Sequence, residues 1–136
     1  MITFKYRAER GEFDEVVYRP VATVEFLSRN GEWIRAHPYI DSGADVTLLP
    51  LSLGRLLGLE IKGEELRELR GVSGHGVPVV FYSLCIKIGS FDFEAHVAWA
   101  LIEEVPPLLG RSDVFDHFDV TFKQRDREIV FEERNA

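Results

Sequence analysis

The chain has 136 residues, 46% of them hydrophobic and 12% aromatic, which is enough to fold as one domain (1–136) around a core without disulfides. Its 16 Lys and Arg residues against 23 Asp and Glu residues give a net charge of −7, which argues against a nucleic-acid partner, whose phosphates would be repelled. The single Cys85 excludes an intramolecular disulfide, and no apolar run resembles a signal peptide or a membrane span, so we expect a cytoplasmic protein with no membrane partner.

Short apolar or alternating runs, separated by Gly, Pro and Asn, predict strands in the first part of the chain. Residues 21–27 form a clear strand, and the Asn30-Gly31 pair that follows is the strongest short hairpin signal. The returning strand spans 33–40, with Pro38 marking a bend or an edge position. This strand leads into a turn-forming run of small and polar residues.

The middle of the chain contains the best short helix, residues 50–58, with Pro50 near its start and Gly58 as its stop. Residues 64–70 are ambiguous between a charged helix and an exposed strand. The remaining elements that we expect are a glycine-rich tip at 71–76, strands at 77–88 and 91–99, a helix of one or two turns at 112–117 that Ser112 caps, and a final hairpin of 118–122 and 128–131.

The run that carries chemistry starts at Asp41, where a hydrophobic strand meets Asp-Ser-Gly, then Ala, then a second acid, Asp45. Asp, Ser and Gly are all common turn formers, so the tripeptide alone indicates no more than a turn. Two later segments extend the pattern: the glycine-rich tip at 71–76, and Pro-Leu-Leu-Gly-Arg at 107–111 before the expected short helix. Three matches in this order are far more specific than any one of them.

Together the three segments resemble the retropepsin-like aspartic proteases, in which Asp-Thr/Ser-Gly-Ala followed by an acidic residue forms the active-site loop. The tip at 71–76 falls where that family has its flap, and 107–111 looks like its hydrophobic-hydrophobic-Gly-Arg signature. The resemblance covers residues 20–131, and cellular proteins with one such domain look closer to this sequence than the viral enzymes do. It implies an all-β acid-protease fold, a single-lobe closed barrel with two short helices.

The resemblance also implies a chemistry, the hydrolysis of peptide bonds. Asp41 matches the catalytic residue of the family, whose attacking water lies between two carboxylates that share one proton. Because the chain contains one Asp-Ser-Gly, the second carboxylate must come from a second subunit, so we expect a homodimer that binds an extended peptide or protein substrate. Neither a metal nor an organic cofactor is expected.

The resemblance assigns further residues to the site. Ser42, Gly43 and Ala44 complete the active-site loop, Asp45, Gly71, Val72, Ser73 and Gly74 bind substrate, and Arg111 braces the loop by pairing with Asp45. An arginine fork and a carboxylate can form a bidentate pair of this kind. The alternative interpretations are plain turn residues, two independent solvated charges at positions 45 and 111, and an ordinary flexible hairpin at 71–76.

Two other functions stay open at this point. The same fold could serve as a catalytically silent dimerisation or peptide-binding module, or an unrelated β-barrel binding protein could carry Asp-Ser-Gly by chance. The tip also has polar Ser73 and His75 where the viral pattern has an apolar residue. Viral dimers interleave their terminal strands, whereas this chain ends in a charged tail at 132–136, so we expect a dimer that is held differently or more weakly.

Overall fold

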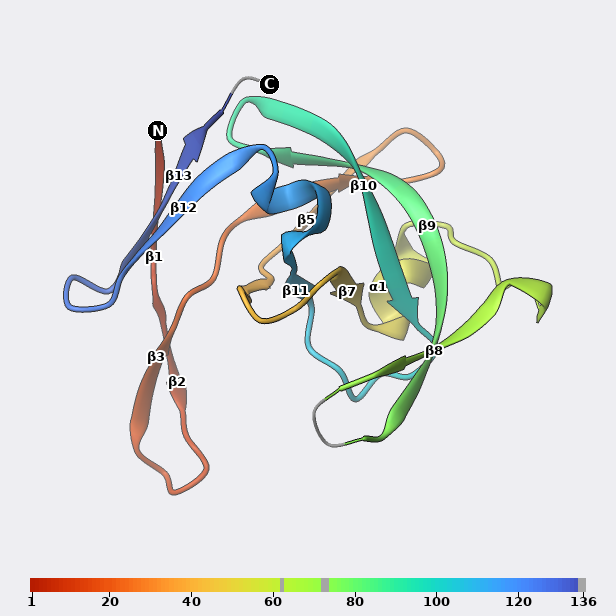
Figure 1. Ribbon diagram of the computed structural model, residues 1–136, viewed down its shortest axis with the longest axis horizontal. Coiled ribbons are helices and arrows are strands. Elements are labelled where there is room, and N and C mark those ends of the chain that lie inside the picture. Colours follow the sequence, from red (N-terminus) through yellow and green to blue (C-terminus); the bar gives the residue numbers. More distant parts are fainter. Residues whose placement is uncertain (62, 72–73, 135–136) are drawn as a thin grey trace.

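The computed structural model describes residues 1–61, 63–71 and 74–134, and within these ranges strands dominate (Figure 1). The strands are β1 (Ile2–Lys5), β2 (Arg7–Arg10), β3 (Val16–Arg19), β4 (Val24–Leu27), β5 (Trp33–Ala36), β6 (Tyr39–Ile40), β7 (Thr47–Leu49), β8 (Leu66–Arg70), β9 (Gly76–Ile88), β10 (Phe91–Ala100), β11 (Leu108–Leu109), β12 (Phe118–Lys123) and β13 (Glu128–Glu133). Two short helices, α1 (Leu51–Leu56) and η2 (Arg111–Phe115), and one 3₁₀ turn, η1 (Gly63–Glu65), accompany them. The predicted all-β class with two short helices is confirmed.

Several local predictions from sequence are also confirmed. β4 and β5 pair antiparallel around the predicted turn, where Gly31 has φ +89°. The chain leaves the sheet at Pro38 between β5 and β6, and α1 is followed by Gly58 at φ +81°. The ambiguous segment 64–70 proves to be mainly strand β8.

None of the helices in the described ranges has the length and apolar character needed to cross a bilayer.

The largest sheet curls until its two ends meet. Its strand order is β5-β4-β9-β10-β7-β11-β6, with β8 pairing on β9. The two longest strands, β9 and β10, pair antiparallel along their length and arch across the molecule (Figure 1). An isolated bridge between Val21 and Tyr39, with hydrogen bonds from Ala22 to Pro38 and from Ile40 to Pro20, joins the segment before β4 to β6. This closure fixes β6, and therefore the residue that follows it.

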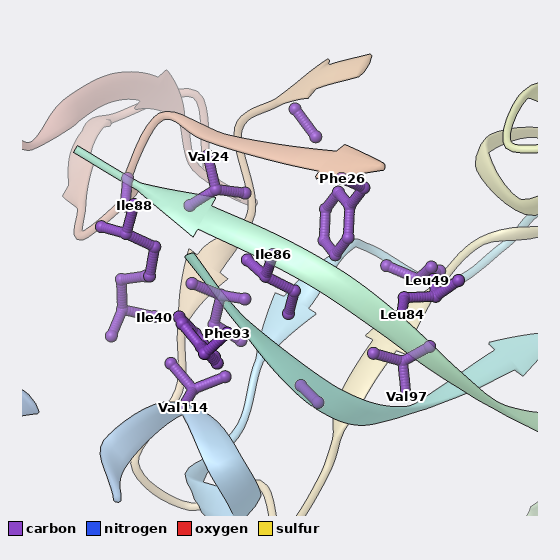
Figure 2. Close-up of a cluster of buried hydrophobic side chains, with 14 of the residues drawn as sticks. Val24, Phe26, Ile40, Leu49, Leu84, Ile86, Ile88, Phe93, Val97 and Val114 are labelled. Atoms are coloured by element: carbon purple, nitrogen blue, oxygen red, sulfur yellow. The ribbon is translucent and has the colours of Figure 1, made fainter. Parts of the chain in front are cut away.

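The core lies inside the curl and follows the alternation of the strands. In β10, Phe93, Ala95 and Val97 are buried while the residues between them are exposed, as period-two patterning predicts. Figure 2 shows side chains from β4, β9 and β10 packed around Ile40 of β6, which is 4% exposed. Full burial of one such side chain contributes about 1.5–3 kcal/mol. The core therefore anchors β6, the strand that directly precedes Asp41.

The two ends of the chain form a separate sheet of order β1-β13-β12. β1 pairs antiparallel with β13, so Ile2 faces Phe131, and β12 pairs with the other edge of β13. Phe118 and Phe131, both in this sheet, are 2% and 0% exposed and pack edge to face. The terminal strands thus pair within one chain.

Strands β2 and β3 form a two-stranded hairpin that projects away from the rest of the molecule (Figure 1). Its turn carries Phe13, which is 85% exposed. The sequence analysis did not predict this hairpin, because residues 7–19 mix many charges with few apolar residues and show no clear period of two.

The start of η2 differs from the predicted helix. Ser112 (φ −58°, ψ 128°) and Asp113 (φ +68°) have non-helical backbone, and no side chain caps this described segment. The backbone N–H groups of Arg111 and Ser112 instead donate to the carbonyls of Ala44 and Asp45, both at 2.9 Å. The prediction that Ser112 caps a helix is therefore wrong, because the left-handed backbone of Asp113 interrupts the helical turn whose N–H groups a Ser112 cap would bind.

Candidate active site

Asp41 lies where three short strands meet. β6 pairs parallel with β11, and β11 also pairs antiparallel with β7. The backbone N–H of Asp41 continues the first of these ladders, donating to the carbonyl of Leu109 at 3.0 Å. Because buried Ile40 precedes it and Leu109 holds its backbone, Asp41 occupies a fixed position although its own side chain is half-buried.

The loop after Asp41 folds back onto the aspartate. The N–H of Gly43 donates to Oδ1 of Asp41 at 2.9 Å, and the N–H of Ala44 donates to its carbonyl at 3.2 Å. This is the local turn that an aspartate side chain makes with the backbone two residues later. It orients the Asp41 carboxylate before any ligand is present.

Arg111 binds the same loop through two hydrogen bonds. Its Nη1 donates to the carbonyl of Ser42 at 2.7 Å, and its Nη2 donates to Oδ1 of Asp45 at 2.5 Å. The two side chains that the sequence analysis paired are therefore in contact. They are also well exposed, 51% for Arg111 and 82% for Asp45, so solvent weakens this ion pair. Its main effect is geometric, since one fork holds both sides of the loop.

Gly110 allows the segment before η2 to approach the backbone of the active-site loop closely. A Cβ on Gly110 would lie 2.3 Å from the carbonyl oxygen of Val46, a backbone atom that cannot move aside. The N–H of Gly110 donates to Oγ1 of the buried Thr47 at 3.2 Å. The sequence analysis quoted Gly110 only as part of a signature and missed Thr47, because a close backbone approach leaves no local pattern.

A groove of about 560 Å³, here called the tip groove, runs between the active-site loop and the β8–β9 hairpin. Asp41 is one of its lining residues. Gly43, Ala44 and Asp45 line the loop side, and Leu69, Arg70 and Gly71 line the hairpin side, with Val46, Leu48, Val77 and Leu108 between them. Five of the predicted site residues thus surround one space that is mostly apolar apart from its carboxylates and Arg70.

The other predicted site residues lie outside that lining. The carbonyl of Ser42 accepts a hydrogen bond from Arg111, and neither Ser42 nor Arg111 lines the tip groove. Gly74, at φ +80°, donates from its N–H to the carbonyl of Gly71 at 3.0 Å and closes the hairpin turn. The predicted substrate-binding residues Val72 and Ser73 lie outside the described residues.

A second groove of about 520 Å³, here called the hairpin groove, also has Asp41 among its lining residues. Glu9 and Arg19 of the projecting hairpin line it, together with Tyr39 from β6. Asp41 and Leu108 line both grooves, so the two spaces meet at the aspartate. The sequence analysis missed this groove because it missed the hairpin.

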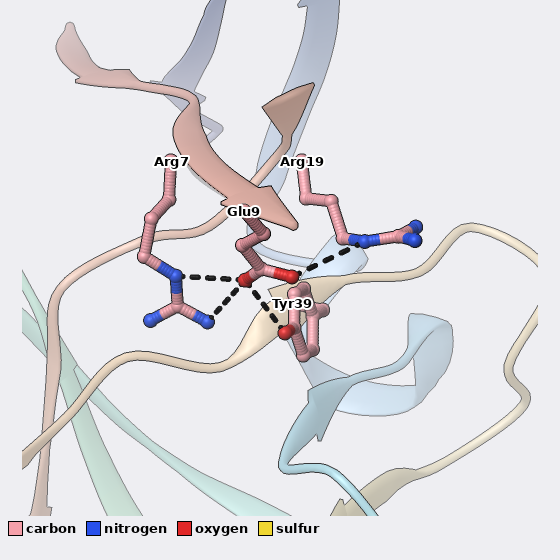
Figure 3. Close-up of polar contacts among 4 residues, drawn as sticks. All are labelled: Arg7, Glu9, Arg19 and Tyr39. Atoms are coloured by element: carbon pink, nitrogen blue, oxygen red, sulfur yellow. Dashed lines mark hydrogen bonds and ion pairs between the residues drawn. The ribbon is translucent and has the colours of Figure 1, made fainter. Parts of the chain in front are cut away.

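Glu9 is the centre of a polar cluster, the Glu9 cluster, formed with Arg7, Arg19 and Tyr39 (Figure 3). Burial acts to raise the pKa of the Glu9 carboxyl. Hydrogen bonds from Tyr39 and Arg7, and the charges of Arg7 and Arg19, outweigh this effect, and the net pKa of Glu9 lies below its ordinary value. Glu9 is therefore held as a carboxylate.

In the part of the chain that the structure describes, no three or more His, Cys, Asp or Glu side chains are placed to hold a metal ion.

Comparison with known proteins places the fold. No family model and no curated protein sequence matches the chain. Among solved structures, the chain is similar to the EIAV protease complexed with the inhibitor HBY-793, with a TM-score of 0.56 and 22% sequence identity. The likeness covers 72% of this chain and 86% of that one. At this identity it shows the fold, and the retropepsin-like all-β fold expected from the sequence is confirmed.

Proposed function

We propose that the chain is one subunit of a homodimeric aspartic endopeptidase, in which the Asp41 carboxylates of two copies activate a water molecule. The observation that carries the proposal is the placement of Asp41. It is held by a backbone bond to Leu109 and by its own turn, and it lies where two grooves meet. A carboxylate fixed at such a junction can act on a chain that passes over it.

The proposed dimer follows from the state of the neighbouring acids. Within the described ranges, three carboxylates line the two grooves, namely those of Asp41, Asp45 and Glu9. Asp45 is bound by Arg111, and Glu9 is bound by the arginines and the tyrosine of its cluster. Neither acid is placed to share a proton with Asp41. The second acid therefore comes from another copy, most simply across a two-fold axis.

Two aspartates packed against each other cannot both ionise, so they share one proton. The ionised member takes a proton from water as the water oxygen bonds to the peptide carbonyl carbon. The protonated member donates its proton to the carbonyl oxygen, giving a neutral tetrahedral intermediate. Proton transfer to the amide nitrogen then allows the carbon–nitrogen bond to break, which releases an acid and an amine.

The two grooves support an extended peptide as the substrate. A peptide in strand conformation places alternate side chains on opposite faces, and the tip groove and the hairpin groove both adjoin Asp41. The proposed flap is the tip at 71–76. Its closure over a bound peptide would exclude water from the cleft. Asp45 and Gly71 line the tip groove and would contact substrate there.

The test compares the parent chain, Asp41→Asn and a matched control, Asp126→Asn, which makes the same change in an exposed turn. Each is incubated with a mixed peptide library from acid to neutral pH, cleavage is located by mass spectrometry, and light scattering reports the oligomeric state. Cleavage by the parent and Asp126→Asn but not by Asp41→Asn supports the proposal. Equal cleavage by all three chains contradicts it, and a stable dimer that cleaves nothing favours a silent binding module.

A further inference from the structure

The hairpin groove has a charged wall built by a segment that the sequence resemblance did not cover. The resemblance begins at residue 20, whereas Glu9 and Arg19 lie on the β2–β3 hairpin before it. Arg19 directly precedes Pro20, whose carbonyl accepts a bond from Ile40, so this wall is tied to the strand that carries Asp41. The hairpin thus adds its own chemistry to the proposed cleft.

Within the Glu9 cluster, one oxygen of the carboxylate is heavily used. Oε2 of Glu9 accepts hydrogen bonds from Nε of Arg7 at 2.8 Å and from the Tyr39 hydroxyl at 2.7 Å, and it also lies 2.7 Å from Nη2 of Arg7 in an ion pair. Arg7 also lies over the Tyr39 ring, with its guanidinium carbon 5.3 Å from the ring centroid. Arg7 is therefore committed to the cluster, and it does not line the groove.

Arg19 is held differently. Its Nε lies 3.2 Å from Oε1 of Glu9, and its side chain is 49% exposed. Figure 3 shows its two terminal nitrogens pointing away from Glu9, and within the described ranges no contact of theirs accompanies the Nε contact. Arg19 lines the hairpin groove. It therefore presents guanidinium N–H donors to that groove while Glu9 fixes the base of its fork.

The charge of the cluster points in the same direction. Two guanidinium groups and one carboxylate give the Glu9 cluster a net charge of +1, although only Glu9, Arg19 and Tyr39 of the cluster line the groove. A hydrogen-bonded guanidinium that keeps part of its fork open favours a carboxylate, which can accept two parallel hydrogen bonds. A lysine or arginine side chain placed beside Arg19 would meet a like charge, and the Glu9 carboxylate that lines the same groove is already bonded within its cluster.

We propose that the hairpin groove is a subsite for an acidic side chain of the peptide substrate, and that Arg19, positioned by Glu9, is its specificity-determining residue. This inference rests on the proposed function only for the identity of the ligand as a peptide that passes over Asp41. Arg19 is half-exposed, so solvent weakens its pairing with an acidic side chain. The expected preference is therefore moderate, about five- to tenfold in affinity, which corresponds to one well-formed charge-assisted hydrogen bond near solvent.

The experiment measures binding separately from cleavage. The Asp41→Asn chain is titrated with labelled octapeptide pools that are blocked at both ends, with one position fixed as Glu, Gln or Lys and scanned along the peptide. Fluorescence anisotropy gives a dissociation constant for each pool. At one or more positions the Glu pool should bind about five- to tenfold more tightly than the Lys pool, with Gln between them, and the difference should shrink as salt is raised.

Two further variants test whether Arg19 causes the preference for the Glu pool. Adding Arg19→Gln to Asp41→Asn should remove the preference for Glu. Adding Arg10→Gln, which deletes an equal charge from the same hairpin at a residue that pairs with Asp14 and does not line the groove, should leave the preference intact. Equal binding of Glu and Lys pools, no binding of any pool, or equal losses in the two variants would overturn the inference.

The peptidase proposal and the acidic-subsite proposal can be disproved independently of each other. Asp41-dependent cleavage of library peptides without acidic enrichment beside the cut removes the acidic subsite and keeps the peptidase. Arg19-dependent binding of acidic peptides to a chain that never cleaves keeps the subsite and removes the peptidase.

Discussion

Arg111 and Asp45 lie 66 residues apart in the sequence, and Nη2 of Arg111 donates a hydrogen bond to Oδ1 of Asp45 at 2.5 Å. The same guanidinium bonds the carbonyl of Ser42, so a single side chain holds the loop on both sides of Gly43. The contact links the start of η2 to the loop that carries Asp41.

Replacing Arg111 should harm function more than stability. Arg111→Ala removes both bonds to the loop, but the ion pair is exposed, so the expected stability loss is only about 1 kcal/mol. Because the loop positions Asp41, we expect kcat/KM to fall by about tenfold or more and the dimer to weaken. Kinetics and analytical sedimentation measure the two effects.

Two further variants show whether the fork itself matters. Arg111→Lys keeps the charge but cannot bond two acceptors in the same way, and it should resemble Arg111→Ala. Arg125→Ala, in an exposed turn, should behave as the parent chain. Full activity and an unchanged dimer in Arg111→Lys would show that charge alone suffices and that the fork does not brace the loop.

Gly110 should tolerate no side chain. An alanine Cβ would lie 2.3 Å from the carbonyl oxygen of Val46, so Gly110→Ala must push β11 and the loop apart. We expect a loss of about 1–3 kcal/mol in the free energy of unfolding, measured by urea denaturation followed by circular dichroism. A Cβ on Gly63 would meet no described atom within 4 Å, so Gly63→Ala serves as the control. Similar stabilities for the two variants would contradict the close approach seen here.

The Glu9 cluster should make stability depend on pH. The pKa of folded Glu9 lies below its ordinary value, against burial, because of Tyr39 and its two arginines. The unfolded chain therefore binds a proton more readily, so the contribution of Glu9 is present above the ordinary carboxyl pKa and is lost as pH falls through the folded pKa. Glu9→Gln should be less stable than the parent at neutral pH, and the gap should close on acidification.

Urea denaturation of both chains between pH 7 and pH 3 measures that gap. Glu12→Gln, which changes an exposed acid at the end of the same hairpin, controls for the general loss of negative charge. A gap between the parent and Glu9→Gln that stays constant with pH would mean that Glu9 acts through shape alone.

Ile40 should couple the core to Asp41. It is 4% exposed and lies directly before the aspartate, so truncation leaves a cavity beneath the active-site strand. We expect Ile40→Ala to cost about 2–5 kcal/mol and Ile40→Val about 0.5–1.5 kcal/mol. Ile40→Val, which should stay folded, should also lower kcat if the strand positions Asp41. Ile61→Val, at a residue 55% exposed, should change neither property.

The sequence by itself determined the elements whose signals are local. Short apolar or alternating runs predicted β9 and β10, and the Asn-Gly pair predicted the turn of the β4–β5 hairpin. The Asp41 run and the later glycine-arginine signature predicted the fold only through their resemblance to a known family, and Asp41 does follow a strand as expected. The strands and the turn depend on backbone preferences and side-chain periods that span only a few neighbouring residues.

Only the tertiary structure decided how distant segments meet. It placed Gly110 against Val46, and it gave Asp113 a left-handed backbone where the sequence predicted a helical turn capped by Ser112. It also folded the charged segment 7–19 into a hairpin whose Glu9 cluster forms a wall beside Asp41. Contacts of this kind depend on the closure of the whole sheet, which brings together residues whose local sequence carries no sign of their partners.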